Sequence, residues 1–195
     1  MLSVEHAPSF KMIENLHLVG KTIYLRKLTE SDVSERYVQW LNDPEINRYM
    51  ENRFLFWTME NLTRYVRQRK EEQSYFFAIC LLNGDTHIGN IKLGPINPYH
   101  LSADIGLMIG DKACWSMGMG TEAIRLVTDF AFRELRLQKL TAGAYIDNAA
   151  SIKAFEKCRF SKEGRLKNHV DSHGKRMDAV LLGYTAVDFV GKNKI

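Results

Sequence analysis

The 195-residue chain has few cysteines and no long apolar run. Cys80, Cys114 and Cys158 are scattered and form no Cys-x-x-Cys pair. They indicate neither a disulfide framework nor a zinc set, which favours a reducing compartment. Residues 1–18 mix charged and apolar side chains without the apolar core of a signal peptide, and no later stretch is long enough to span a bilayer. We therefore expect a cytoplasmic protein with no membrane partner.

The sequence also lacks a dense basic tract. Its formal net charge of +4 is mild, which suits an anionic ligand such as a nucleotide cofactor but does not indicate nucleic acid. The arginines and lysine of residues 64–70 are better explained as the solvated face of a helix. No His, Cys or Asp spacing typical of a metal site is present. We expect neither a nucleic-acid partner nor a bound metal.

Length and composition indicate one domain. A hydrophobic fraction of 45% and a charged fraction of 26% are ordinary for a globular protein of this size. No repeat or linker divides the chain. We assign residues 20–186 to a single domain, with an N-terminal extension over 1–19 and a C-terminal tail over 187–195.

The hydrophobic periodicity alternates between strand and helix patterns. The first helix is expected between the capping residues 29–32 and the stop at 42–44, and a polar and aromatic loop follows at 45–57. Three further helices are expected over 58–72, 118–135 and 148–157. Strands are expected over 22–28, 75–81, 87–93, 103–109, 139–145, 159–167 and 177–184. This order predicts an α/β (α+β) domain with a mixed, mostly antiparallel, seven-stranded sheet and about four helices.

The stretch from Trp115 to Ala123 joins the strand ending at Ile109 to a long amphipathic helix. Gly118 and Gly120 allow a backbone to approach a ligand without obstruction by a Cβ atom. The free N–H groups of the first helical turn, together with the helix dipole, then favour an anion. The stretch therefore indicates a phosphate cradle, although a Gly-x-Gly turn before a helix is often only a tight connection.

Two motifs together resemble the GNAT superfamily of acyl-CoA-dependent N-acetyltransferases. The first is this turn, in which Gly118 and Gly120 match the family glycines and Trp115 replaces the usual Arg or Gln. That replacement is typical of the ribosomal-protein N-terminal acetyltransferase branch. The second is Asn148-Ala149-Ala150-Ser151 followed by the segment 156–160, which is similar to the Asn-x-x-Ser…Glu-Lys-x-Gly-Phe motif with Arg159 in place of glycine.

The resemblance implies a GNAT-like fold with a central splayed strand pair, acetyl-CoA as co-substrate and no metal. Exposed backbone of one splayed strand would bind the pantetheine arm and polarise the thioester. The residues implied to contact the coenzyme are Leu107, Met108, Ile109, Trp115, Ser116, Met117, Gly118, Met119, Gly120, Thr121, Asn148 and Ser151.

The resemblance also implies two catalytic side chains. Ser151 would donate a proton to the departing thiolate, because Phe155 lies where many relatives carry a tyrosine acid. A water would do the same, and Asn148 with Ser151 equally fits a helix cap. Asp104 matches the position of a catalytic carboxylate in some members, although a carboxylate paired within the sheet is the alternative. His169, near the base of the ribosomal-protein branch, fits a surface strand better.

Acceptor recognition is expected from the first two helices and their loop. The candidates are Trp40, Asn42, Asn47, Arg48 and Tyr49, of which Trp40 fits a buried helix face equally well. This stretch also resembles enzymes that acetylate amino groups on nucleotide-linked deoxysugars. The predicted acceptor is therefore a protein N-terminus or an amine-bearing small molecule such as an amino sugar on a nucleotide carrier. A non-catalytic acyl-CoA-binding module is the alternative function, and a homodimer is common among relatives.

Overall fold

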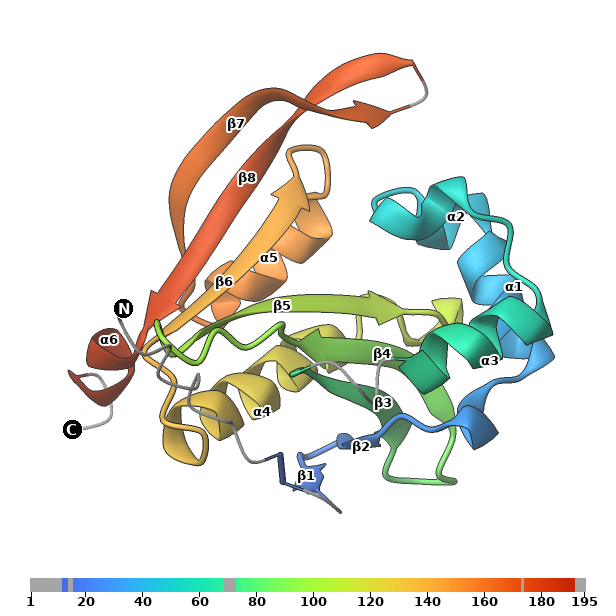
Figure 1. The fold of residues 1–195 in the computed structure, drawn as a ribbon, viewed down its shortest axis with the longest axis horizontal. Helices are drawn as coiled ribbons and strands as arrows, with labels where there is room; N and C mark the ends of the chain where they lie inside the picture. The colour runs from blue at the N-terminus through green and yellow to red at the C-terminus, as the bar shows by residue number, and fades with distance from the viewer. Residues whose placement is uncertain (1–11, 14–15, 69–72, 173, 192–195) are drawn as a thin grey trace, which may run out of the picture.

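The computed structural model describes residues 12–13, 16–68, 73–172 and 174–191. Its centre is one eight-stranded sheet with the order β1-β2-β3-β4-β5-β6-β8-β7 (Figure 1). Only β5 and β6 are parallel; every other neighbouring pair is antiparallel. The strands are β1 (His17–Val19), β2 (Ile23–Lys27), β3 (Tyr75–Leu81), β4 (His87–Leu93), β5 (Ser102–Ile109), β6 (Lys139–Tyr145), β7 (Ser161–Ser172) and β8 (Lys175–Thr185).

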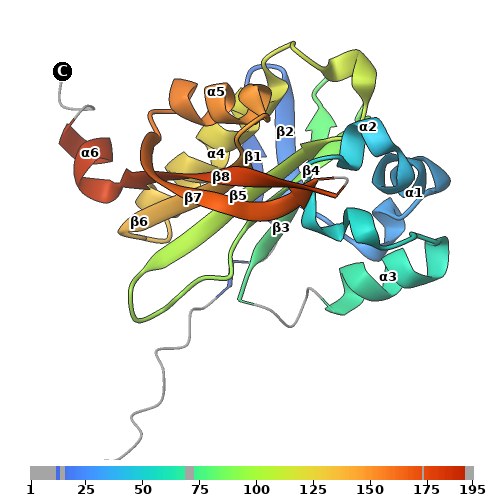
Figure 2. The same cartoon turned by 90° about the horizontal axis from the view of Figure 1, so that it is seen from above.

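Helices cover both faces of the sheet (Figures 1 and 2). The larger core lies under α4 (Met119–Arg133) and α5 (Ala149–Lys157) and includes Phe77 and Ile79 of β3. The smaller core lies under α1 (Glu35–Asn42) and α3 (Met59–Gln68) and includes Ala78 and Cys80 of the same strand. Because successive strand residues point to opposite faces, the two helix pairs lie on opposite sides of the sheet.

The described residues contain one more strand and two more α-helices than the sequence predicted. The extra strand is β1, which is only three residues long and pairs with β2. It lies within the predicted N-terminal extension, before residue 20. The extra helices are α2 (Pro44–Asn47) and α6 (Ala186–Gly191). Asp43 and Pro44 predict a helix stop, but Asp43 also caps α2 and Pro44 occupies its first turn.

Three short 3₁₀ turns complete the described chain: η1 (Glu30–Asp32), η2 (Glu51–Phe54) and η4 (Lys112–Cys114). The first predicted helix is thus divided, because Val33 is extended and Ser34 caps α1. Parts of the predicted extension, of the second predicted helix (69–72), of the last turn (173) and of the tail (192–195) lie outside the described residues. No helix within the described ranges is long and apolar enough to cross a bilayer.

The parallel pair separates along its length, as predicted. β5 and β6 pair only at Ser102 with Lys139, Ala103 with Leu140 and Asp104 with Thr141. Beyond that point β5 continues along β4 to Ile109, and β6 continues along β8 to Tyr145. Figure 1 shows the two strands diverging toward their carboxyl ends. The divergence opens the middle of the sheet.

Candidate active site between the diverging strands

The diverging strands present two small residues to the space between them. Strand alternation places Asp104, Gly106 and Met108 of β5 on the face covered by α1 and α3. Thr141, Gly143 and Tyr145 of β6 lie on the same face, since Leu140, Ala142 and Ala144 enter the opposite core. A Cβ atom added at Gly106 or Gly143 would meet nothing within 4 Å. Open space therefore borders both strands just beyond the last pair.

The free edge of β5 lies where the coenzyme arm was predicted. Leu107 and Ile109 pack against the larger core and Met108 enters the smaller one, so their side chains anchor the strand. Their inner backbone edge has no ladder partner on β6. Backbone groups in such an edge require partners. The Leu107 backbone and the Ile109 amide are therefore geometrically available, whereas the Met108 carbonyl faces β4. The Ile109 carbonyl accepts a hydrogen bond from the Trp115 indole.

The turn before α4 leaves an anion-binding arrangement of amides. Gly118 adopts a left-handed φ of 84°, as does Ser116 with 61°. The first backbone N–H of the helix with an intrahelical partner is that of Glu122, which donates to the Gly118 carbonyl at 2.9 Å. The preceding amides of Met119, Gly120 and Thr121 have no partner among the described residues. They form the positive end of a 15-residue helix.

Two further contacts hold this turn against β5. The Trp115 indole N–H donates to the Ile109 carbonyl at 2.8 Å, so the tryptophan fixes the turn to the strand end. A Cβ atom on Gly120 would lie 3.2 Å from Leu107 Cδ1, which shows how closely the helix start approaches β5. The exposed Met117 lies between these contacts.

Glu122 fastens the first turn of α4 to the loop between β1 and β2. Its carboxylate accepts hydrogen bonds from the Lys21 amide and from the amide and hydroxyl of Thr22, the latter at 2.5 Å. Burial alone would raise the pKa of Glu122, but these hydrogen bonds outweigh it and lower the pKa. The ionised carboxylate thus stabilises the position of the cradle.

The start of α5 brings the second motif to the same edge of the sheet. β5 and β6 run in parallel, so α4 and α5, which follow them, both begin beyond the open ends of the strands. The Asn148 side chain accepts a hydrogen bond from the Ser151 amide at 3.1 Å and caps the helix. The half-buried Ser151 hydroxyl has no hydrogen-bond partner in the part of the chain described. The capping role of Asn148 leaves that hydroxyl available.

Asp104 lies exposed at the point where the strands separate. The Thr141 hydroxyl donates to its carboxylate across the last parallel pair. This carboxylate is therefore held on the open face of the sheet. His169 lies apart, exposed on β7.

Three of the predicted acceptor residues pack against or form hydrogen bonds with other residues of the protein. Trp40 is 6% exposed and its ring lies 5.2 Å from that of His87. Asn42 donates to the Trp57 carbonyl and accepts from the Trp57 amide. The buried Asn47 donates to the Leu41 carbonyl at 2.7 Å. These three side chains shape the loop that follows α1.

Arg48 and Tyr49 lie where that loop meets β6. The Arg48 guanidinium lies 4.6 Å from the centre of the Tyr49 ring. The Tyr49 hydroxyl donates to the Asp147 carbonyl at 3.1 Å, and its ring packs edge-on against Tyr145. The structure thus brings these two predicted residues to the end of β6, separate from Trp40.

Three residues outside the predicted acceptor contacts complete this wall. The Tyr145 hydroxyl donates to Glu51 at 2.7 Å and receives a hydrogen bond from Arg53 at 2.6 Å. Arg53 also donates to the Asp171 carbonyl of β7. Burial, followed by the hydrogen bond to Glu51, raises the pKa of Tyr145. The signal for Tyr145 was strand alternation, which places it on the same face as Thr141 and Gly143.

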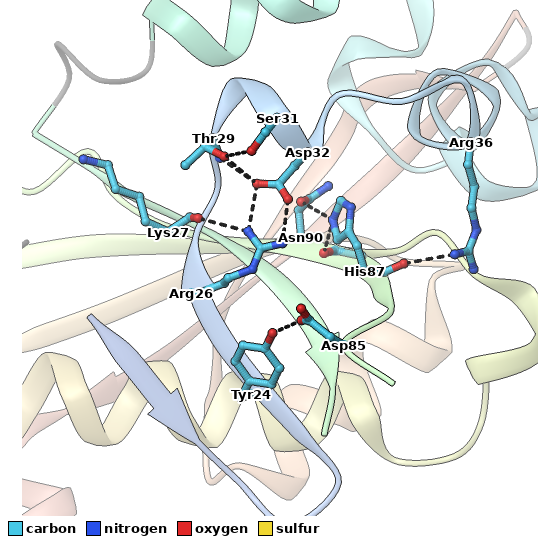
Figure 3. A network of polar contacts seen from close by, with 11 residues as sticks. Tyr24, Arg26, Lys27, Thr29, Ser31, Asp32, Arg36, Asp85, His87 and Asn90 are labelled. Carbon is cyan, nitrogen blue, oxygen red and sulfur yellow. Dashed lines mark hydrogen bonds and ion pairs between the residues drawn. The ribbon is translucent and has the colours of Figure 1, made fainter. Parts of the chain in front are cut away.

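A polar network holds the α1 region on the sheet (Figure 3). Arg26 and Asp32 form a bidentate ion pair at 2.6 and 2.9 Å. His87 Nε2 lies 2.9 Å from the Gly89 carbonyl and 3.0 Å from Asn90 Oδ1. One ring nitrogen facing two acceptors identifies the Nε2–H tautomer. The Arg26–Asp32 pair fixes η1 to β2. Arg36 of α1 donates to the His87 carbonyl at 3.3 Å, which ties α1 to β4.

The chain was compared with known proteins. A family model described as an acetyltransferase (GNAT) domain matches residues 22–161. The sequence is 34% identical to the probable N-acetyltransferase YjcK of Bacillus subtilis over 80% of this chain and 90% of that protein. It is 26% identical to the uncharacterized N-acetyltransferase p20 of Bacillus licheniformis over 88% and 99% of the two chains.

Solved structures share the fold. The spermidine N-acetyltransferase of Vibrio cholerae in complex with CoA and spermine superposes with a TM-score of 0.78, 20% identity and coverage of 87% of this chain and 98% of that one. A GNAT-family acetyltransferase from Bacillus anthracis gives 0.77, with 18% identity and coverage of 88% and 99%. Within the described residues, no group of three or more His, Cys, Asp or Glu could hold a metal ion.

Proposed function

Because the chain belongs to the GNAT superfamily of acetyl-CoA-dependent N-acetyltransferases, we propose that it acetylates a primary amine that reaches the thioester from the α1–α3 face. The observation that carries this proposal is the separation of β5 and β6 beyond the Asp104–Thr141 pair. It leaves open space at Gly106 and Gly143 between the coenzyme side and the acceptor side.

The donor is placed by backbone groups. The amides of Met119, Gly120 and Thr121 would bind the diphosphate of acetyl-CoA, and the unpaired edge of Leu107 to Ile109 would bind the pantetheine arm. Ser116, Met117 and Gly118 form the turn that aims these amides. Trp115 holds the turn to β5. Because its indole is uncharged, it would not form an ion pair with the diphosphate.

The chemistry requires a neutral amine and a stabilised thiolate. We assign Asp104 as the group that accepts the proton of the attacking amine, directly or through water, and Thr141 as the residue that holds it. Ser151 would donate a hydrogen bond to the departing thiolate at the positive end of α5, with Asn148 fixing the start of that helix. A coenzyme thiol resembles the cysteine thiol, whose pKa is about 8.5, so a modest stabilisation suffices for its departure near neutral pH.

The acceptor wall combines aromatic rings with charges of both signs. Tyr49 offers a half-buried ring that packs on the buried Tyr145, Glu51 offers a carboxylate and Arg48 an exposed guanidinium. Such a wall suits either a protein N-terminus or an amino sugar on a nucleotide carrier, where Arg48 would meet a phosphate. The Vibrio cholerae neighbour is a spermidine N-acetyltransferase, which makes a polyamine a third acceptor worth testing.

An acceptor screen tests this function. Thiol release from acetyl-CoA would be measured with N-terminal peptides, amino-sugar nucleotides and polyamines in parallel, first with the wild type and then with Glu51→Gln and Arg48→Gln. Selective turnover of a polyamine that Glu51→Gln weakens would identify a cationic acceptor. Turnover of an amino-sugar nucleotide that Arg48→Gln weakens would identify the sugar. The names of the curated relatives favour an enzyme over a non-catalytic acyl-CoA-binding module, and coenzyme binding without turnover on any amine would overturn the proposal.

A further inference from the structure

A strongly basic pocket, partly open to solvent, lies away from the diverging strands. It has a volume of about 230 Å³ and is bordered by α4, the end of α5, β8 and α6. Four cationic side chains line it, Arg125, Arg133, Lys157 and Arg159, against one carboxylate, Asp129. Its formal lining charge is therefore +3, from four positive groups and one negative. We name this cavity the basic pocket.

Arg159 has an unfavourable backbone conformation for its residue type. Its φ is 72°, in the left-handed region that favours glycine. It directly follows Cys158, the C-terminal cap of α5, and its amide donates to the Glu156 carbonyl at 2.9 Å. Glycine is the usual residue at this position of a helix end. An arginine in this conformation lowers the stability of the folded chain relative to glycine, and it places a guanidinium at the pocket.

Helix-end electrostatics explain only part of the cluster. Arg133 and Lys157 lie in the last turns of α4 and α5, where a cation offsets the partial negative charge of the helix end. Arg125 lies in the middle of α4, and Arg159 lies beyond the end of α5. Asp129 lies one turn from both Arg125 and Arg133 on α4. Burial raises the pKa of its carboxyl despite the positive charge of Arg133. Stabilisation of helix ends therefore explains Arg133 and Lys157 but not Arg125 and Arg159.

The floor of the pocket carries a polar group that lacks a partner. Thr128 is 4% exposed, and its hydroxyl is buried without a hydrogen-bond partner among the described residues. Beside it, the Cys158 thiol donates to the Thr121 carbonyl at 3.3 Å. Burial raises the pKa of this thiol to about 11, so the floor stays uncharged. A buried hydroxyl beneath a ring of cations suits an oxyanion.

Most of the pocket lies away from the coenzyme cradle, although Cys158 bonds to the Thr121 carbonyl beneath the cradle. Thr128 lies nine residues after Met119 in α4, which corresponds to about 13 Å along the helix. Arg133 lies further still from the amides that form the cradle. The volume is also below the 300–1,000 Å³ or so that is typical of sites for drug-sized ligands. The pocket is thus the size of an anionic group and not of a whole nucleotide.

We propose that the basic pocket binds a phosphate group, either the free ion or a terminal phosphate monoester, independently of acetyl-CoA. Arg159 and Arg125 supply the charge-assisted hydrogen bonds, Arg133 and Lys157 add positive potential, and the Thr128 hydroxyl receives its missing partner. Phosphate bound here would fasten the ends of α4 and α5 to one another.

The chain offers a matched control for the test. Arg136 is also an exposed arginine with a left-handed φ, 56°, and it does not line the pocket. Arg159→Gly and Arg136→Gly each remove one positive charge and one unfavourable backbone conformation. Both variants should therefore raise the Tm in phosphate-free buffer.

Binding of inorganic phosphate, and of glycerol phosphate as a monoester, would be measured by titration calorimetry at constant ionic strength. We expect saturable binding to the wild type and to Arg136→Gly, and at least a tenfold loss with Arg159→Gly. Arg125→Gln, which removes the second hydrogen-bonding arginine and leaves the backbone conformation of Arg159 unchanged, should show a similar loss. Absence of saturable binding to the wild type, or equal affinity of the two glycine variants, would overturn the proposal.

A competition experiment decides whether the site is independent. We expect acetyl-CoA to bind with the same affinity with and without saturating phosphate, and Arg159→Gly to bind acetyl-CoA and dephospho-CoA as the wild type does. Displacement of phosphate by acetyl-CoA, together with a loss of preference for acetyl-CoA over dephospho-CoA in Arg159→Gly, would show instead that the pocket belongs to the coenzyme site.

Discussion

The Thr141 hydroxyl donates a hydrogen bond to the Asp104 carboxylate across the last parallel pair of β5 and β6. The contact lies at the point where the strands separate. It therefore fixes a carboxylate beside the open space at Gly106 and Gly143. In the proposed reaction this carboxylate contacts the incoming amine and accepts its proton as the amine attacks the thioester.

Replacement of Asp104 tests its role as base. Asp104→Asn keeps the size of the side chain but removes the proton acceptor, so kcat/KM should fall about 100-fold at neutral pH. The loss should shrink toward pH 10, where a free amine with a pKa of about 10.4 deprotonates in solution. Thr141→Val keeps the carboxylate and should cost only severalfold. An unchanged kcat/KM in Asp104→Asn across the pH range would exclude the role.

Ser151→Ala removes the hydroxyl proposed to stabilise the thiolate. Because the Ser151 amide and not its hydroxyl bonds to Asn148, the helix cap stays intact. We expect kcat to fall at least tenfold while the Kd for acetyl-CoA, measured by calorimetry, changes less than twofold. Ser161→Ala on β7, which removes a hydroxyl bonded to the Gly183 carbonyl, serves as the comparison and should retain kcat. Full turnover in Ser151→Ala would transfer the role to water.

Gly118→Val tests the coenzyme cradle. A β-branched residue at a φ of 84° costs about 1–2 kcal/mol in backbone strain and redirects the amides of the following turn. The Kd for acetyl-CoA should rise at least tenfold. Gly174→Val is the matched control, because Gly174 has a φ of 78° and its added side chain also meets open space. Equal coenzyme affinity in the two variants would contradict the cradle.

His87 predicts a pH dependence of stability. Burial lowers its pKa below the ordinary 6.5, so the folded protein keeps the ring neutral where the unfolded chain takes up a proton. The free energy of unfolding should therefore fall as the pH drops below about 6.5, by at most about 1.4 kcal/mol per pH unit from this residue. Urea denaturation at pH 7.5 and 5.5 should show a smaller difference for His87→Gln than for the wild type. The exposed His100→Gln variant should keep the wild-type difference, and an unchanged difference in His87→Gln would refute the assignment.

The sequence predicted the elements whose physical signals are local. Alternation and helical spacing located the strands from β2 to β8 and the helices α3, α4 and α5, because each buries a continuous apolar face. β1 was missed because three residues cannot establish a period. α2 was missed because Asp43 and Pro44 end one helix and begin the next.

The candidate site likewise has parts that local sequence motifs predict and parts that depend on long-range contacts. The Gly118 turn and the Asn148 cap are local motifs, so the sequence revealed them. The wall of Glu51, Arg53 and Tyr145 depends on contacts over more than 90 positions, which no local pattern encodes. Trp40 fits both a buried and an acceptor-facing hypothesis in the sequence, and its packing against His87 supports the buried one.

The most direct measurement of the central claim is acceptor-dependent release of coenzyme A thiol, followed by mass analysis of the acceptor. The wild type should release one thiol for each amine that gains an acetyl group, at a rate that saturates with both substrates. Asp104→Asn should bind acetyl-CoA normally yet turn over slowly. Thiol release that does not depend on any amine, or tight binding of acetyl-CoA without release, would contradict an N-acetyltransferase working between β5 and β6.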